Sequence, residues 1–182
     1  STIKECDTIF HIENGKLNSI KPFPPKKIRP CVFEYIYFAR PDSVLNGKTA
    51  YEHRKNLGAE LAKENKTEAD IIVPVPDSGN AAALGFAQFL NKKFELGLVR
   101  NHYVGRTFIE PSQQIRSLGV KLKLNANKSA IKDKKIILVD DSLVRGTTSH
   151  KIVKMLYDAG AKEVHVKIAC PEIRYPDFYG VD

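Results

Sequence analysis

The most constraining feature of the chain is a short apolar run that ends in two adjacent carboxylates. Residues 136–139 (Ile-Ile-Leu-Val) are followed directly by Asp140 and Asp141, and then by a loop rich in Ser, Arg, Gly and Thr. A continuous apolar run is typical of a parallel strand that is buried on both faces. Helix-like periodicity resumes after Ser149. The segment therefore predicts a buried strand whose carboxyl end opens into a turn at a helix N-terminus.

The loop has the composition of an anion-binding turn. Gly146 can adopt backbone conformations closed to other residues, so its amide and those of Thr147 and Thr148 can point at one oxyanion. The helix dipole favours negative charge at the same place. Asp140 and Asp141 would repel a phosphate in direct contact, so we expect them to accept hydrogen bonds from sugar hydroxyls or to hold Mg²⁺. The alternative is a pair of solvated Asp residues before an ordinary Thr-capped helix.

A second polar turn follows another apolar strand earlier in the chain. Residues 70–75 predict a strand and residues 80–90 a helix, and the turn between them carries Asp77, Ser78 and Gly79. Ligands of open parallel sheets bind at the carboxyl ends of the strands. A simple Asp/Ser helix cap would explain this turn in isolation. Together with the downstream turn, it predicts one shared site.

Strand and helix patterns alternate from residue 31 to the end. Strands are expected at about 32–39, 70–75, 96–99, 136–139 and 164–168, with helices between the later ones. The first helix is expected to run from about Thr49 through Leu57 and Leu61, and the core candidates of the later helices are Leu84, Ala87, Phe89, Ile152, Met155, Leu156 and Ala159. Alternation of this kind predicts an α/β fold with a central parallel sheet flanked by helices. At 182 residues, with 42% hydrophobic and 27% charged residues, the chain is globular in composition.

The first thirty residues have a different pattern. Residues 8–12 and 16–20 flank Asn14-Gly15, which predicts a hairpin with a type I′ turn. Prolines and lysines then predict an extended linker up to residue 30. We therefore expect a hairpin and linker over 1–30 and a separate domain over 31–182.

Residues 100–128 form a long connection without clear periodicity. The segment carries the basic residues Arg100, Arg106, Arg116, Lys121 and Lys123 and the apolar residues Tyr103, Phe108 and Ile109. Connections of this length inside a compact domain are usually functional lids or disordered. Basic and apolar groups together fit a flap that closes over an anion and excludes water. The alternative is a surface excursion that binds nothing.

Charge and composition exclude several classes of protein. The net charge is +8, but the basic residues are spread along the chain, without zinc-finger spacing or an RNA-recognition signature. A small polyanionic substrate is the more economical partner, since positive potential steers phosphates into a cleft. No apolar stretch has the length of a membrane span, and there is no signal-peptide pattern. Three scattered cysteines indicate reduced thiols in a cytosolic protein, and the five histidines form no catalytic pattern.

These motifs together resemble a known enzyme family. Residues 136–149 resemble the phosphoribosyl pyrophosphate (PRPP) signature of type I phosphoribosyltransferases. Residues 33–43, 75–79, 103–109 and 175–182 are similar, in the same order, to segments of the amidophosphoribosyltransferases. The resemblance runs from about residue 31 to the end and implies the type I phosphoribosyltransferase fold.

The resemblance also implies roles for individual residues. It assigns pyrophosphate to Asp77, Ser78 and Gly79, the ribose hydroxyls to Asp140 and Asp141, and the 5-phosphate to Ser142, Arg145, Gly146, Thr147, Thr148 and Ser149. It places Mg²⁺ near Ser78, Asp140 and Asp141, and it adds Tyr103 and Arg106 to the two aspartates as catalytic candidates.

The implied reaction transfers the phosphoribosyl group of PRPP to ammonia. The products are 5-phosphoribosylamine and pyrophosphate, in the first step of purine synthesis. Relatives carry a preceding glutaminase domain with an N-terminal cysteine and are expected to be homo-oligomers; this chain starts at Ser1, so the hairpin is interpreted as a remnant of that domain and no glutamine hydrolysis is expected. Neither nucleic acid nor membrane is expected as a partner.

Two alternatives accompany this interpretation. A PRPP-sensing transcriptional regulator shares the fold, but the chain has no helix-turn-helix candidate and keeps residues 103–108. Some relatives bind an iron–sulfur cluster with a ligand at the position of Cys31; the second ligand position holds Asp177 here, so Cys31 is expected to be a buried thiol without a cluster.

Overall fold

The computed structural model describes residues 9–22, 24, 31–101, 124–144, 146–172 and 174. The chain forms two compact units, Ser1–Ala50 and Tyr51–Asp182. Within the described residues, no helix combines the length and apolarity needed to cross a membrane. The sequence-based boundary at residue 30 stays a prediction, and the two units are taken separately below.

The first unit begins with the predicted hairpin. Strands β1 (Ile9–Glu13) and β2 (Lys16–Ile20) pair antiparallel around Asn14 and Gly15. Both turn residues have positive φ, 51° and 74°, as a type I′ turn requires. The hairpin prediction is therefore confirmed.

Residues 31–50 correct two predictions. The expected strand over 32–39 is wrong, because a helical turn followed by the π-helix η1 (Glu34–Phe38) occupies this stretch and buries Ile36. The aromatic and β-branched residues favour a strand, but this preference depends on packing against neighbouring strands. Cys31, expected to be buried, is exposed at the start of this turn. Two short antiparallel strands, β3 (Val44–Leu45) and β4 (Lys48–Thr49), follow.

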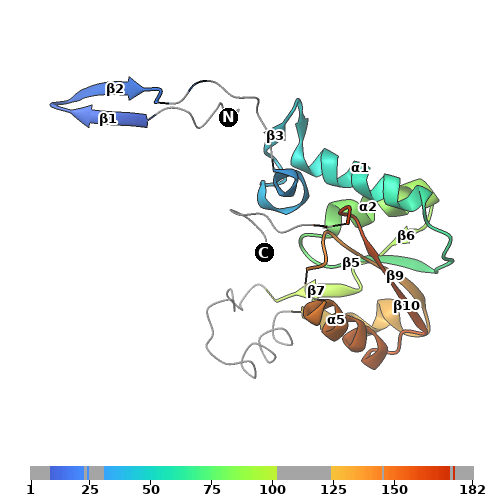
Figure 1. The fold of residues 1–182 in the computed structure, drawn as a ribbon. Helices are drawn as coiled ribbons and strands as arrows, with labels where there is room; N and C mark the ends of the chain where they lie inside the picture. Colours follow the sequence, from blue (N-terminus) through green and yellow to red (C-terminus); the bar gives the residue numbers. More distant parts are fainter. Residues whose placement is uncertain are drawn as a thin grey trace. The chain divides into compact units, whose positions relative to one another are not determined.

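The second unit is built on a four-stranded parallel sheet, shown in Figure 1. Its strand order is β10-β9-β5-β6, with bounds Glu163–Ile168, Lys135–Asp140, Ile71–Pro74 and Lys93–Phe94. Strands β5 and β9 are neighbours in register, from Ile71 opposite Ile136 to Pro74 opposite Val139. The predicted central parallel sheet is confirmed, and its two inner strands are the ones that lead into the polar turns.

Helices cover both faces of this sheet (Figure 1). Side chains of β9 alternate, so that Ile136 and Leu138 pack on one face while Ile137 and Val139 pack on the other. The first face is covered by α5 (Thr147–Asp158), α4 (Lys128–Ile131) and the antiparallel pair β7 (Leu98–Arg100) and β8 (Leu124–Ala126). Helices α1 (Ala50–Lys63) and α2 (Asn80–Leu90) lie over the second face. The inner strands are thus buried on both sides, as their apolar sequences predict.

Small residues form the contact between α1 and α2. A Cβ on Gly58 would lie 1.8 Å from the Ala82 carbonyl oxygen, and one on Gly85 would lie 1.9 Å from that of Lys55. The two backbones therefore touch, and neither glycine can carry a side chain without separating the helices.

This close crossing explains which core predictions failed. Phe89 was expected in the core but is 51% exposed, whereas Phe86 is fully buried. Leu84 of α2, also expected in the core, is only half-buried, whereas the predicted core residue Ala87 is buried. The predicted core of α5 fares better, since Ile152, Leu156 and Ala159 are buried and Met155 packs against them.

Candidate active site

The two polar turns meet at the carboxyl edge of the sheet. The Val75 amide donates to the Val139 carbonyl with an N···O distance of 2.9 Å, which joins the end of β5 to the end of β9. A Cβ on Gly79 would lie 2.5 Å from the same carbonyl oxygen. The turn that carries Asp77 and Ser78 therefore packs directly on β9, and it requires glycine at this position. The sequence prediction that both turns form one site is consistent with this geometry.

The backbone of the aspartate pair is held on both sides. The carbonyls of Asp140 and Asp141 accept hydrogen bonds from the amides of Ala169 and Cys170, at 3.0 and 2.9 Å. The Asp141 amide donates to Asp140 Oδ1 at 2.9 Å, and the Ser142 amide donates to Asp141 Oδ1 at 2.8 Å. Each carboxylate thus has one oxygen tied to the chain beside it, which fixes the direction of the other.

Asp140 has an unusual protonation equilibrium. Burial raises the pKa of its carboxyl to about 7, and the hydrogen bond and negative charge of Asp141 act in the same direction. The Asp141 amide and a hydrogen bond with Ser78 partly oppose this rise. Near neutral pH a nearby cation would stabilise the ionised form. The contact with Ser78 links the second turn to the first.

Asp141 is buried and incompletely satisfied. Its side chain belongs to a residue only 6% exposed, and its Oδ2 atom has no hydrogen-bond partner among the described residues. Its position at the end of a strand predicts a carboxylate that faces ligand or solvent, and the observed burial excludes bulk solvent. A buried carboxylate oxygen without a partner is costly, so the site favours a ligand that supplies a donor or a cation.

Sequence reasoning missed the charged group behind this carboxylate. Arg54 of α1 is only 8% exposed and interacts electrostatically with Asp141. Burial lowers the pKa of Arg54, and the negative charge of Asp141 opposes that change. A signal was present, because Ala50, Arg54, Gly58 and Ala62 share a four-residue spacing and all four are buried. One arginine in a row of small residues indicates a specific partner.

The turn before α5 has the backbone expected of an oxyanion site. Gly146 precedes the helix with a φ of 69°, which confirms the predicted need for glycine. No acceptor among the described residues takes the amides of Thr147, Thr148 and Ser149, and no side chain caps the helix. These first-turn donors are available to an anion. Arg145 lies outside the described residues.

The long segment after β7 begins with an ion pair to the first turn. The Arg100 guanidinium donates to Asp77 Oδ2, and both side chains are partly exposed. This contact brings the start of the predicted flap to the pyrophosphate candidate turn. The remaining flap candidates, Tyr103 and Arg106 among them, lie outside the described residues.

The donor set fits a hard divalent cation. Two carboxylates and a hydroxyl, from Asp140, Asp141 and Ser78, are oxygen ligands of the kind that Mg²⁺ prefers, and the unpartnered Asp141 oxygen leaves one ligand position open. Clusters of three or more His, Cys, Asp or Glu side chains suited to a metal are absent from the described residues. A cation here would therefore take its other ligands from water or from a phosphate-bearing substrate. The buried Oδ1 atom of Asn80, the first residue of α2, likewise has no hydrogen-bond partner among the described residues, and no role was predicted for it from the sequence.

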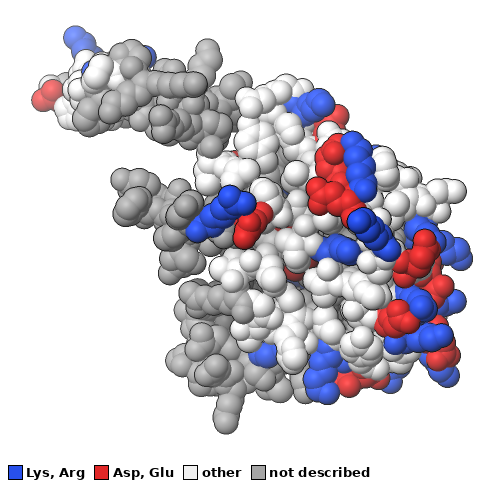
Figure 2. Space-filling view, turned by 45° about the vertical axis from the view of Figure 1, so that its right-hand side comes forward, with Lys and Arg blue, Asp and Glu red and all other residues white. Residues whose placement is uncertain are grey.

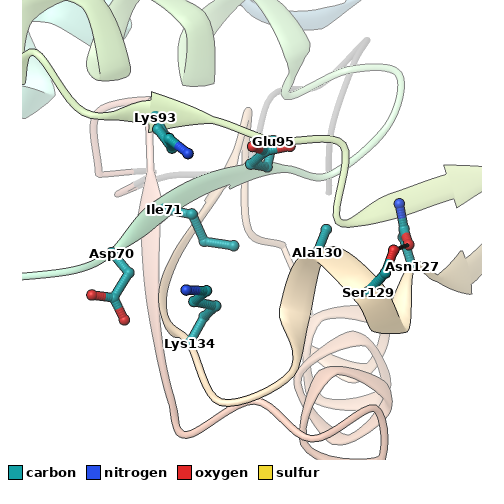
Figure 3. Close-up of a pocket in the computed structure, with 8 residues that line it drawn as sticks. All are labelled: Asp70, Ile71, Lys93, Glu95, Asn127, Ser129, Ala130 and Lys134. Carbon is teal, nitrogen blue, oxygen red and sulfur yellow. Dashed lines mark hydrogen bonds between the residues drawn. The ribbon is translucent and has the colours of Figure 1, made fainter.

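The hollow in Figure 3 is at the other end of the sheet. It has a volume of about 370 Å³, and its lining residues are Asp70, Ile71, Lys93, Glu95, Asn127, Ser129, Ala130 and Lys134. Several of them stand at the amino ends of β5, β6 and β9, and none is a candidate site residue. On the face shown in Figure 2, basic and acidic side chains are interspersed, which agrees with a solvated charged surface.

Comparisons with known proteins agree with this arrangement. Residues 42–174 match the phosphoribosyl transferase domain family. An amidophosphoribosyltransferase of Rhizobium etli is 59% identical over 91% of this chain, and one of Bacillus subtilis is 54% identical over 84%. A solved structure of a glutamine PRPP amidotransferase from B. subtilis, complexed with ADP and GMP, is 48% identical and matches 96% of this chain with a TM-score of 0.80.

The chain spans about a third of the length of these relatives, namely 34%, 32% and 38% of the three. None of them supports the alternative of a transcriptional regulator.

Proposed function

Because the chain belongs to the phosphoribosyltransferase family, we propose that its carboxyl-edge site binds PRPP and transfers the phosphoribosyl group to ammonia. The products are 5-phosphoribosylamine and pyrophosphate. The observation that carries the proposal is the meeting of the Asp140-Asp141 pair with the Asp77-Ser78-Gly79 turn, one buried carboxylate oxygen being unpartnered. The similar proteins cited above are named amidophosphoribosyltransferases, which supports a nitrogen acceptor, proposed here to be ammonia.

The described residues supply complementary contacts to a PRPP molecule. The carboxylates of Asp140 and Asp141 accept hydrogen bonds from the two ribose hydroxyls. The amides and hydroxyls of Thr147, Thr148 and Ser149 hold the 5-phosphate at the helix N-terminus, with Ser142 beside them. The 5-phosphate and the ribose are thereby fixed at both ends, which holds C1 in place for attack.

Pyrophosphate binds at the first turn in this proposal. The backbone of residues 77–79 receives it, and Gly79 allows the close approach of this turn to β9. Mg²⁺, held by Asp140, Asp141 and Ser78 when bound, would neutralise charge on the departing pyrophosphate.

Ammonia attacks C1 as the bond to pyrophosphate breaks, through an oxocarbenium-like transition state with inversion. The protein contributes position and charge stabilisation. Tyr103 and Arg106 are proposed to close over the reacting centre and exclude water.

The setting of the whole protein is part of the same proposal. We infer that in the full-length protein a glutaminase domain delivers ammonia, that the active form is a homo-oligomer, and that the compartment is the cytoplasm.

Pyrophosphate release from PRPP tests the reaction directly. With Mg²⁺ and an ammonium salt, the chain should release pyrophosphate at a rate that rises with pH toward the pKa of ammonium, because more NH₃ is then present. Glutamine should not replace ammonia for this chain alone. Failure to bind PRPP with Mg²⁺, measured by calorimetry, would refute the proposal.

A further inference from the structure

We propose that Arg54 is a positioning residue for the aspartate pair: its buried guanidinium supplies the countercharge that holds Asp141 ready for the ribose of the substrate. This inference rests on the proposed function and deepens it. It adds a residue from α1, outside both polar turns, to the machinery that binds PRPP.

The location of Arg54 is fixed by the contact between two helices. Lys55, the next residue, has its carbonyl oxygen 1.9 Å from the position that a Cβ on Gly85 would take, and Gly58 meets Ala82 in the same way. Helix α1 is therefore held against α2 by backbone contacts on either side of one turn. Since α2 starts directly after the Asp77-Ser78-Gly79 turn, this contact sets the distance between Arg54 and the site.

Arg54 and Asp141 are both buried and carry opposite charges, so each can compensate the other. Among the described residues, Arg54 and Asp141 are the buried charged ones, 8% and 6% exposed, and they have opposite sign. A single buried charge is costly, and a buried partner of opposite sign offsets much of that cost. Helix α1, which carries Arg54, packs on α2, and α2 begins directly after the turn that packs on β9, so the negative charge of Asp141 acts on the Arg54 guanidinium.

The arrangement leaves the carboxylate free to bind. Asp141 Oδ1 accepts the Ser142 amide, while Oδ2 has no hydrogen-bond donor among the described residues, Arg54 included. The guanidinium thus supplies positive charge near the carboxylate and does not occupy the oxygen that a ribose hydroxyl needs.

Removal of the charge should weaken binding of PRPP. In Arg54→Met we expect Kd for PRPP at saturating Mg²⁺ to rise at least tenfold, and in Arg54→Lys, which keeps the charge, to stay within about threefold of the parent. Lys63→Met removes an exposed basic group from the same helix and is the matched control, with no expected change. Equal losses in Arg54→Met and Arg54→Lys would overturn the countercharge role.

A double-mutant cycle separates positioning from a structural role. Where Asp141→Asn has already neutralised the carboxylate, Arg54→Met should change Kd by less than threefold, because there is no charge left to hold. The double variant removes both buried charges, so it should fold even if Arg54→Met alone does not.

The outcomes of the cycle are distinct. The inference would be refuted if Arg54→Met raised Kd for PRPP by the same factor in the parent and in Asp141→Asn. Two other measurements take the place of Arg54→Met if that variant does not fold. The inference is then refuted if the double variant has a melting temperature at least a few degrees below that of Asp141→Asn and Arg54→Lys binds PRPP tenfold more weakly than the parent. Absence of PRPP binding by the parent chain would instead refute the proposed function.

Discussion

The two edges of the parallel sheet treat charge in opposite ways. At the amino edge, Lys135 pairs with Glu163 at 2.8 Å and His165 lies 3.3 Å from the same carboxylate, all on partly exposed side chains. At the carboxyl edge, Asp141 is buried, its Oδ2 atom has no hydrogen-bond partner among the residues that the structure describes, and Asp140 has a raised pKa. Charges at the first edge are satisfied by neighbours and water. Charges at the second edge gain their missing partners only when a ligand or cation binds, which is typical of a functional site.

The largest effect should come from Asp141 itself. Asp141→Ala removes a charged hydrogen-bonding partner of the substrate, which should weaken PRPP binding by on the order of 1.5–3 kcal/mol. Because the change also leaves Arg54 buried without its countercharge, we expect a lower free energy of unfolding too. Calorimetric titration with Mg²⁺ and PRPP gives the first quantity and chemical denaturation the second. Unchanged affinity would remove Asp141 from the site.

The protonation of Asp140 should make binding depend on pH. Its pKa is raised from 3.8 to about 7, so Mg²⁺-dependent PRPP affinity should increase as pH rises through 7 and the carboxylate ionises. The free energy of unfolding changes with pH in the opposite direction. The stabilisation that comes from protonation of Asp140 in the folded protein is fully present below the unfolded pKa of 3.8 and is lost as pH rises through about 7. Asp140→Asn should therefore be more stable than the parent at pH 8, by on the order of 1 kcal/mol or more.

Both measurements sharpen the comparison of the edges. Titration of PRPP affinity between pH 6 and 8 should give a slope in the parent and a flat profile in Asp140→Asn. A parent profile without slope would show that burial of this carboxyl is not coupled to binding.

A smaller effect is expected where the carboxyl edge meets solvent. Arg100→Met removes the partner of Asp77, and the unpaired carboxylate then repels pyrophosphate. Since this ion pair is partly exposed, the loss in PRPP affinity should be about 0.2–1 kcal/mol. Competition by free pyrophosphate measures it, and Arg100→Lys is the matched control because it keeps the charge. Tighter pyrophosphate binding in Arg100→Met would contradict the expected direction.

The smallest effect belongs to the amino edge. Glu163→Gln breaks the contacts to Lys135 and His165, but these groups are partly exposed, and Lys135 and Glu163 begin β9 and β10, at the opposite end of the strands from both turns. The Lys135 ammonium holds the pKa of Glu163 below its usual range, so the small stabilisation is present at neutral pH and fades on acidification. Affinity for PRPP should not change. A marked loss would mean that the two edges are coupled.

The sequence predicted the sheet and its polar turns better than the packing around them. Apolar runs ending in polar turns located β5 and β9, and the positive φ of Gly146 followed from the need for an anion-binding turn. The expected strand over 32–39 failed because β-branched and aromatic residues indicate pleated packing only where a partner strand exists.

Contacts between helices were harder to predict. Phe86 and Phe89 are both apolar residues of α2, and the choice between them depends on where α1 crosses. Arg54 was missed for the same reason, because its partner is 87 residues away in the chain (141 minus 54) and is brought to it by tertiary structure. Local sequence patterns predict where a strand ends. They do not predict which side chain of a neighbouring helix tertiary packing brings to that end.

The glycine contact between α1 and α2 makes the electrostatics of the site depend on the size of two residues. A methyl group at position 58 or 85 would push α1 outward, since 1.8 or 1.9 Å to a carbonyl oxygen leaves no room for it. Arg54 would move with the helix, and the field it exerts at Asp141 would fall as the separation grows. Two uncharged residues thus determine the electrostatic potential at the sheet edge, because they set the distance between the Arg54 guanidinium and the Asp141 carboxylate. Substitutions there should alter ligand affinity without touching a single ionisable group.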